Sequence, residues 1–277
     1  MKKMTELHVP KARVARFVGL TRRALYPSCT EPCPRRRPDE GSLCRAVRRV
    51  ALAHVTFGHR RVHSVLRQEG WEVNRKRVYR ILQEEQLLKE AHFPRPRVPE
   101  SGSLEAACPN DRWYMDITYL ETTDRGPCPL VLVQDACTRE IVAHGFFPSC
   151  GAMEAADVVD AAVLSRFPKT GRAEGLVLRT DGGPQFVAHR FQDRMRSLGI
   201  TLQASIKRRP ESNGMIESTN GHLKADYFWP REPTTFLETR GRVDAAVSDF
   251  NERRPHSSLD YLSPKAYARK KMEEVEA

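Results

Sequence analysis

An acidic residue inside an apolar stretch places the strongest constraint on how this chain folds. Residues 113–120 read W-Y-M-D-I-T-Y-L, a pattern that predicts a buried strand with Asp116 in its middle. A charged carboxylate in a buried strand costs free energy unless it is paired or bound to a metal. The fold is therefore expected to bring either a paired group or a metal ion to Asp116.

Two further acids stand beside turn and helix signals later in the chain. Asp181 ends the short apolar run 175–180 and precedes Gly-Gly-Pro, which is how a strand runs into a turn. Glu217 follows Ser-Asn-Gly in a segment with helical spacing, and 35 residues separate it from Asp181. Taken singly, Asp181 is an ordinary turn residue and Glu217 an ordinary acid on a helix surface. Three acids on three separate elements together predict a metal site made by folding.

The sequence around these acids resembles a known family. D-I-T-Y at 116–119, T-D-G-G-P-Q-F at 180–186 and N-G-M-I-E-S-T-N-G-H-L-K at 213–224 are similar to the DDE catalytic core of OrfB-type insertion-sequence transposases, relatives of retroviral integrases. The resemblance covers nearly the whole chain, since N-x-x-R-P-H-x-x-L and P-x-x-Y at 251–267 match the closing words of the family. It implies that Asp116, Asp181 and Glu217 are the catalytic residues and the metal ligands.

The chemistry implied by the resemblance explains why carboxylates are needed. Two Mg²⁺ ions about 3.5–4 Å apart can activate water and stabilise the alkoxide that leaves a phosphodiester. Such hard cations prefer oxygen ligands, and Mn²⁺ is expected to substitute. By resemblance, Asp116 bridges the two ions, while Asp181 and Glu217 hold one each.

Polar residues near the acids are candidate DNA contacts. Asn213, Asn220 and Lys224 stand at −4, +3 and +7 from Glu217, so they share one face if the helix starts that early. Lys224 is expected to meet a DNA phosphate, and the two Asn to hold the Glu or the DNA. Asn213 is equally a candidate helix cap. The Gly-Gly-Pro turn is expected to form a mobile loop over the site, with Gln185 as a substrate contact.

The net charge of +11 is concentrated in the first third of the chain. Residues 1–100 carry 23 Lys and Arg against 10 Asp and Glu, whereas the remaining 177 residues carry 23 against 25. This asymmetry favours a nucleic-acid-binding arm joined to a near-neutral body. A basic tail that only keeps the chain soluble would give the same count.

Two segments of the basic region have helix-turn-helix features. Residues 12–26 predict a short helix, a Gly turn and a basic second helix, followed by a Pro/Arg-rich linker. In 42–89 the helical spacing recurs, Gly70 ends one helix and Asn74 is expected to cap the next. A solvated basic helix on a bundle would show the same pattern. The side chains of this last helix that are expected to be free for DNA are Arg75, Lys76, Arg77 and Arg80.

The body of the chain predicts an α/β fold. Three antiparallel strands, then a helix, a strand, a helix and a strand follow the order of an RNase H-like (integrase core) mixed five-stranded sheet with flanking helices, preceded by an all-α helix-turn-helix region. The expected elements span 113–121, 129–134, 140–147, 152–167, 176–180, 189–198 and 201–205. The expected divisions are a partial helix-turn-helix with linker (1–41), a helix-turn-helix DNA-binding domain (42–89), a linker (90–110), the catalytic core (111–232) and a C-terminal helical extension packed on the core (233–277).

The functional expectation is a DNA transposase. The resemblance implies cleavage at the ends of an insertion element and strand transfer by attack of the freed 3′-OH. The partners it implies are double-stranded DNA, a small upstream OrfA product, joined in some cases by frameshifting, and further copies of the chain on DNA. A structure-selective nuclease of the same fold without strand transfer, and a non-catalytic DNA-binding derivative, remain open alternatives.

The expected location is the bacterial cytoplasm, in association with the nucleoid. No run of about 18 apolar residues predicts a transmembrane helix, and the N-terminus lacks the apolar segment of a secretory signal. The seven cysteines are then expected to be reduced thiols.

Overall fold

The computed structural model describes residues 40–88, 106, 108–204 and 214–276. The chain divides into two compact units, 1–43 and 44–277. The first is described only from Glu40 onward, so the predicted helix-turn-helix of 12–26 and its linker lie outside the described residues. Most of the predicted linker 90–110 also lies outside them.

Three helices form the basic region that is described. They are α3 (Glu40–Ala53), α4 (His59–Gln68) and α5 (Arg75–Glu84). Asn74 caps α5, because its side chain accepts a hydrogen bond of 2.9 Å from the backbone N–H of Lys76. Gly70 adopts a φ of 86° after α4, a left-handed conformation that Gly enters without strain. Apolar side chains at helical spacing hold the three helices together, namely Val47, Val50, Val62, Leu66, Val78, Ile81 and Leu82.

A five-stranded sheet with the order β3-β2-β1-β4-β5 forms the centre of the body. Its strands are β1 (Arg112–Thr122), β2 (Gly126–Asp135), β3 (Ile141–Phe146), β4 (Val177–Thr180) and β5 (Thr201–Ala204). The first three strands pair antiparallel as a meander, and β4 and β5 continue the sheet in parallel with β1. β1 is therefore the central strand.

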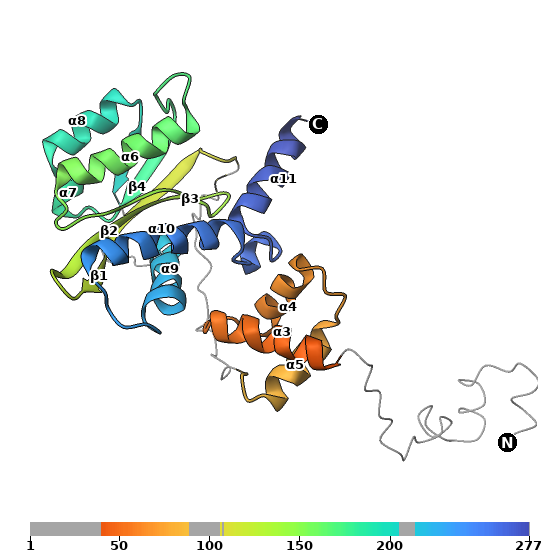
Figure 1. Cartoon of the computed structure of the whole chain (residues 1–277). Coiled ribbons are helices and arrows are strands. Elements are labelled where there is room, and N and C mark those ends of the chain that lie inside the picture. Colours follow the sequence, from red (N-terminus) through yellow and green to blue (C-terminus); the bar gives the residue numbers. More distant parts are fainter. Residues whose placement is uncertain (1–39, 89–105, 107, 205–213, 277) are drawn as a thin grey trace, which may run out of the picture. The chain divides into compact units, whose positions relative to one another are not determined.

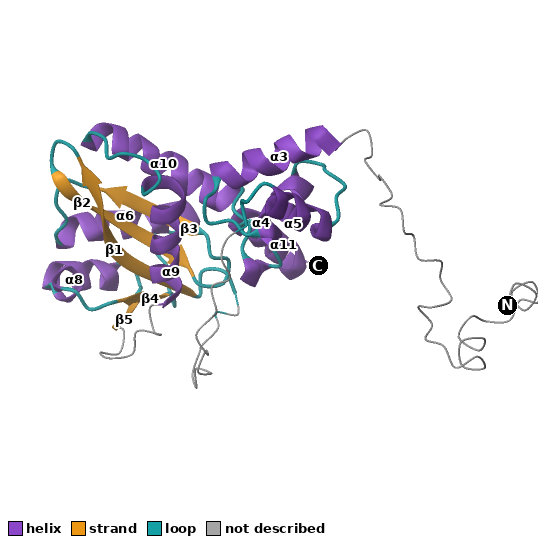
Figure 2. Cartoon of the chain, turned by 90° about the horizontal axis from the view of Figure 1, so that it is seen from below, coloured by secondary structure: helices purple, strands orange, loops and turns teal. Residues whose placement is uncertain are grey.

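Helices cover both faces of the sheet (Figures 1 and 2). On one face lie α6 (Ala152–Arg166), α7 (Pro184–Val187) and α8 (His189–Ser197). On the other lie α9 (Gly214–Leu223) and α10 (Phe236–Glu252). A π-helical segment η3 (Lys224–Phe228) continues α9, and a 3₁₀ turn η4 (Ser257–Leu259) leads to α11 (Pro264–Glu276).

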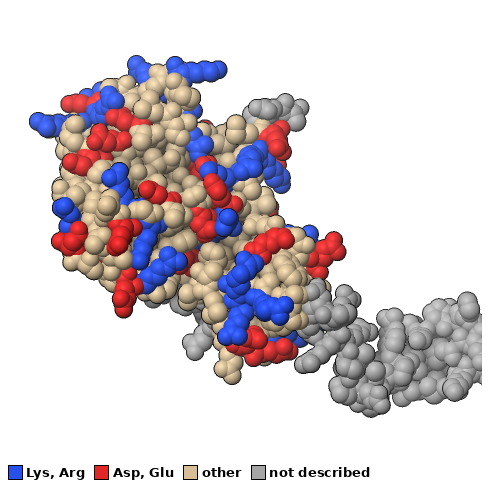
Figure 3. All heavy atoms as spheres, viewed as in Figure 1, with Lys and Arg blue, Asp and Glu red and all other residues tan. Residues whose placement is uncertain are grey.

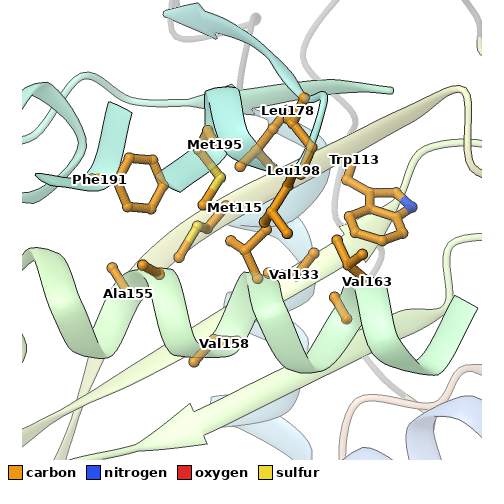
Figure 4. Close-up of a cluster of buried hydrophobic side chains, with 14 of the residues drawn as sticks. Trp113, Met115, Val133, Ala155, Val158, Val163, Leu178, Phe191, Met195 and Leu198 are labelled. Atoms are coloured by element: carbon orange, nitrogen blue, oxygen red, sulfur yellow. The ribbon is translucent and has the colours of Figure 1, made fainter. Parts of the chain in front are cut away.

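Each face has its own apolar core. The core under α6 and α8 contains Trp113 and Met115 of β1, together with the small residues of α6 (Figure 4). The core under α9 and α10 contains Tyr114 and Leu120 of the same strand. Since successive side chains of a strand point to opposite faces, β1 serves both cores. The predicted fold class, a mixed five-stranded sheet with flanking helices preceded by a helical region, is confirmed.

Two local details differ from the sequence expectations. The segment after Asp181 was expected to be a loop, but residues 184–187 form the helical turn α7, with Pro184 at its first position, where the missing N–H costs nothing. The end of α9 changes to π geometry at Lys224, which no sequence pattern predicted. Among the described residues, the helices are all too short or too polar to span a bilayer.

Candidate active site

Asp116 lies on the face of the central strand that α9 covers. It shares this face with Tyr114, because both belong to the same alternation along β1. β4 pairs with β1 in parallel, with Trp113 opposite Leu178. Asp181 follows the last residue of β4 directly. The two acids are thus carried by neighbouring strands.

Two side-chain hydrogen bonds fasten α9 to the sheet. The Asn220 amide Nδ2 donates to Asp116 Oδ2 at 2.7 Å, and the Thr219 hydroxyl donates to Gln134 Oε1 of β2 at 3.0 Å. Residues 216, 219, 220 and 223 are the buried positions of α9, the spacing of one helix face. The contacts of this face fix the position and rotation of α9, which carries Glu217, relative to the sheet.

The charge state of Asp116 reflects the other two acids. The pKa of its carboxyl is raised to about 6, first by burial and next by the negative charge of Asp181, with a smaller contribution from Glu217. The hydrogen bonds from the Ile117 backbone and from Asn220 oppose this rise. The structure therefore brings Asp181 and Glu217 each within electrostatic reach of Asp116.

The turn after β4 holds the Asp181 carboxylate. The Gly183 N–H donates to Asp181 Oδ1 at 2.9 Å, and Gly182 adopts a φ of 76°. A Cβ built on Gly183 would lie 3.1 Å from Gln185 Oε1 and 3.2 Å from Asp181 Oδ1. The predicted substrate contact Gln185 therefore lies beside Asp181, on the first turn of α7.

Asn220 stands three residues after Glu217 in α9, a spacing that makes the two neighbours on the helix surface. Glu217 is exposed, whereas Asn220 is buried against the sheet and donates to Asp116. Asn220 therefore holds Asp116, whereas it was expected to hold Glu217 or the DNA. Lys224 is partly buried at the start of the π-helical segment, and Asn213 lies outside the described residues.

The donor set suits a hard cation, although the side chains do not form a ready-made cage. Within the described ranges, no group of three His, Cys, Asp or Glu side chains stands close enough to hold a metal ion. The candidate ligand atoms are carboxylate oxygens, the ligands that Mg²⁺ and Mn²⁺ prefer. The Asn220 carbonyl Oδ1 is also buried, without a hydrogen-bond partner. Carboxylate and amide oxygens fit a hard divalent cation better than a softer metal.

The predicted DNA-contacting residues of α5 differ in their exposure. Arg75, Lys76 and Arg80 are exposed, but Arg77 is partly buried and interacts within the protein, so it was wrongly expected to be free. A hollow of about 480 Å³ beside the start of α5 is lined by Arg60, Arg67, Arg75 and Lys76, among others. Lys and Arg gather on the visible face of the helical region, whereas both signs are interspersed over the core (Figure 3).

A buried ion pair at the end of η3 was not predicted. Asp226 and Arg254 are both fully buried, with Arg254 Nη2 donating to Asp226 Oδ2 at 2.9 Å. Arg254 belongs to the N-x-x-R-P-H sequence, which was expected only to pack the last helix. The N-x-x-R-P-H motif was the one signal in the sequence, and it did not identify the partner of Arg254. His256 packs edge-on against Phe250, and burial lowers its pKa to about 3, as expected for a packing residue.

Comparison with known proteins agrees with this geometry. The HTH-like domain family matches residues 38–95, and two Integrase core domain families match 106–210 and 198–264. A 31.7 kDa protein of insertion element IS407 from Burkholderia multivorans is 30% identical over 275 residues, covering 96% of this chain and 92% of that protein. Transposase InsD of insertion element IS2 from Escherichia coli is 30% identical over 250 residues, covering 85% of this chain and 81% of that protein. The chain belongs to the insertion-element transposases.

The transposase also resembles viral integrases in fold. A chain of the simian T-cell lymphotropic virus intasome, solved in complex with the PP2A regulatory subunit B56 gamma, aligns with a TM-score of 0.50. It is 19% identical and covers 80% of this chain and 74% of that one. The predictions of family, function and enzyme class are confirmed: the transposase is a polynucleotidyl transferase that acts on DNA through an integrase-like core.

Proposed function

We propose that Asp116, Asp181 and Glu217 are the catalytic residues of this transposase and that they hold divalent cations. The observation that supports the proposal most is geometric: β1, which holds Asp116, pairs with β4, which ends just before Asp181, and Asn220 of α9, the helix of Glu217, donates to Asp116. The pKa of the half-buried Asp116 carboxyl, raised by burial and by the charges of Asp181 and Glu217, agrees with it, because a bound cation would offset this repulsion. Asn220 supports the arrangement by orienting the Asp116 carboxylate.

The proposed reaction has two steps, a hydrolysis and a transesterification. In the first, water attacks the phosphorus at the element end, and the bond to the 3′ oxygen breaks to leave a free 3′-OH. In the second, that 3′ oxygen attacks a phosphorus of the target strand and displaces the target 3′ oxygen. Bound Mg²⁺, or Mn²⁺ in its place, would lower the pKa of the attacking oxygen and neutralise charge on the leaving one.

The remaining polar residues are proposed to bind and position DNA. Gln185, which lies beside Asp181, and Lys224, seven residues after Glu217, are proposed to contact the DNA backbone next to the reacting phosphorus. Asn213 is proposed to contribute from the same segment as Glu217. The exposed Arg75, Lys76 and Arg80 of α5 are proposed to bind the element end, in the manner of a recognition helix.

The partners proposed for the reaction are two element ends, the target duplex and further copies of the chain. Joining of two ends to one target needs at least two active sites, which favours a multimer on DNA. A small upstream OrfA product is proposed to add terminal-repeat recognition, either separately or as a frameshift fusion. We also propose that two ions are bound at once.

The test is a strand-joining assay with purified full-length protein. Duplexes that end in the terminal sequence of the encoding element, with the 3′-OH already exposed, are mixed with supercoiled plasmid and Mg²⁺. The expected result is a joined product that disappears in Asp116→Asn, Asp181→Asn and Glu217→Gln. Glu121→Gln, which changes an exposed acid of the same strand as Asp116, should keep wild-type activity. Full activity in any of the three variants would overturn the assignment.

The same assay separates the alternatives. Cleaved but never joined DNA would identify a structure-selective nuclease, and DNA binding without cleavage in either Mg²⁺ or Mn²⁺ would identify a non-catalytic derivative. Transposition is favoured because all three acids are present and because the chain belongs to the insertion-element transposases.

A further inference from the structure

Packing alone does not explain why the ion pair Asp226–Arg254 is buried. Both side chains are 0% exposed. Replacing a buried ion pair with apolar residues of similar size is often neutral or stabilising, so such a pair is weak evidence for stability. Its best-attested use is to fix how elements are arranged relative to one another.

Asp226 is saturated by donors from two distant segments. Its Oδ2 accepts from Arg254 Nε at 3.1 Å and Nη2 at 2.9 Å, and its Oδ1 accepts from the Thr56 backbone N–H at 3.1 Å and from the Thr56 hydroxyl. Thr56 lies in the turn between α3 and α4, inside the same compact unit as the other two residues. Arg254 Nη2 also reaches Thr56 Oγ1 at 3.4 Å, which closes a three-residue network.

Aromatic rings enclose the network and restrict it to one geometry. The Arg254 guanidinium lies 5.3 Å from the ring centre of Phe57 and 5.7 Å from that of Phe250. Phe57 belongs to the α3–α4 turn and Phe250 to α10. A planar guanidinium donates hydrogen bonds in fixed directions. Because the two rings hold the Arg254 guanidinium in place, they also fix the direction from which Asp226 can accept its hydrogen bonds.

The network acts on the helix that carries Glu217. Asp226 lies nine residues beyond Glu217 on the continuous segment formed by α9 and η3. Glu217 is exposed, whereas Asp226 is buried. The Thr219–Gln134 and Asn220–Asp116 bonds hold the middle of this segment to the sheet. The Asp226 network holds its C-terminal part, within η3.

We propose that Arg254 and Thr56 are positioning residues that set the helix bearing Glu217 through Asp226, so that the order of the α3–α4 turn is coupled to the geometry of the catalytic acid. The proposal rests on the proposed role of Glu217 for its catalytic consequence. Its structural part, a coupling of Thr56 to α9 across 170 residues of sequence, stands independently of that role.

Hydrogen exchange of the full-length protein tests the coupling directly. Thr56→Val removes the hydroxyl donor but keeps the shape and the backbone N–H. Exchange of the amides in 214–223 should become about fivefold faster in this variant, the effect expected for one hydrogen bond. Arg254→Lys should show a larger increase, because an ammonium cannot donate to Asp226 and Thr56 with the same fork.

Two matched controls separate the network from a general loosening. Ser64→Ala removes a different hydrogen bond of the helical region, from the Ser64 hydroxyl to the Tyr261 carbonyl at 2.9 Å. Lys265→Met removes the exposed pair of Lys265 with Glu252, which has the same 2.9 Å separation as the buried pair. Neither should change exchange in α9. Unchanged α9 exchange in folded Thr56→Val, or an equal increase in Ser64→Ala, would overturn the proposal.

The catalytic consequence is read from the Mg²⁺ dependence of strand joining. A positioning role predicts that Thr56→Val raises the half-saturating Mg²⁺ concentration by about fivefold while the rate at saturating Mg²⁺ stays close to wild type. A purely structural role would lower only the amount of active protein and leave the half-saturation point unchanged, which would contradict the proposal. If Glu217→Gln proves fully active, the proposed catalytic site fails, while the exchange experiment still decides the coupling.

Discussion

At the scale of single residues, Asp116 combines a structural cost with a proposed catalytic use. The Asp116 carboxyl has a pKa of about 6, above its usual value of 3.8. Both burial and the negative charge of Asp181 oppose its ionised form. Asn220 is its direct hydrogen-bond donor from α9. The side chain therefore lowers the stability of the metal-free fold at neutral pH, which is common for residues kept for function.

This cost predicts a pH-dependent gain in stability for Asp116→Asn. Between the unfolded pKa of 3.8 and the folded value of about 6, the folded state binds more protons, so wild-type stability falls as pH rises through that window. In EDTA at pH 8 the variant should be more stable by about 1–2 kcal/mol, and the gain should shrink toward pH 4. Thermal unfolding at several pH values measures it. Glu121→Gln should show no such trend, and a pH-independent difference for Asp116→Asn would contradict the argument.

Gly183 is a second residue whose identity follows from contact distances. A methyl group there would stand 3.1 Å from Gln185 Oε1 and 3.2 Å from Asp181 Oδ1, closer than ordinary van der Waals contact. Gly183→Ala should therefore shift the Asp181 carboxylate and lower strand-joining activity about tenfold or more, with little change in unfolding temperature. Gly58→Ala is the control, because nothing lies within 4 Å of its added Cβ. Wild-type activity in Gly183→Ala would show that this turn tolerates a side chain.

At the scale of elements, Thr219 and Asn220 fix α9 to the sheet, and a glycine near its C-terminal end lowers its helix propensity. Gly221 is exposed within α9 and has open space around an added Cβ. Gly221→Ala should stabilise the protein by about 0.5–1 kcal/mol, since Ala has the higher helix propensity and a less flexible unfolded chain. Thermal or denaturant unfolding measures the gain. A loss of stability would mean that the space around Gly221 is needed by another part of the chain.

The exposed basic residues of α5 predict how DNA affinity depends on salt. Replacing Arg75, Lys76 and Arg80 together with Ala should weaken binding at all DNA sequences and reduce the slope of log affinity against log salt by about 3 if each contacts a phosphate. Fluorescence anisotropy over a range of KCl concentrations measures this slope. Replacing the exposed Glu84 of the same helix with Gln should not reduce it. An unchanged slope in the triple variant would remove α5 from the DNA interface.

The elements that the sequence predicts well are those with a strong repeating pattern. The meander, α6 and the cap of α5 follow from alternation, from the helical spacing of small apolar residues and from Asn74. The π-helical segment and α7 were missed, because both depend on tertiary contacts: Asp226 is drawn inward by Arg254 and Thr56, and Gln185 lies against the Asp181 turn. The three acids were chosen from their sequence motifs, and their joint role stays a prediction. Asn220 as the partner of Asp116 was not predicted, because helical spacing alone placed it beside Glu217.

At the scale of the whole molecule, the positive charge and the three proposed catalytic acids lie in different parts of the chain. The excess of Lys and Arg lies in residues 1–100, and the remainder of the chain is close to neutral. A near-neutral core that carries three carboxylates would repel DNA weakly by itself, so the basic region is the part expected to bring DNA to it. The network of Thr56, Asp226 and Arg254 then links the region that attracts DNA to the helix that bears Glu217.

The side-by-side pairing of β1 and β4 has a consequence for how such chains can vary. Because Trp113 lies opposite Leu178, neighbouring backbones determine how far apart Asp116 and Asp181 stand, and the length of chain between them does not. The connections 136–140 and 167–176 can therefore grow or shrink in relatives without displacing either carboxylate. One residue inserted into β1 just ahead of Asp116, in contrast, would turn the acid into the opposite core. Insertions are thus best tolerated in these two connections and least tolerated within β1, however near in sequence a connection lies to one of the acids.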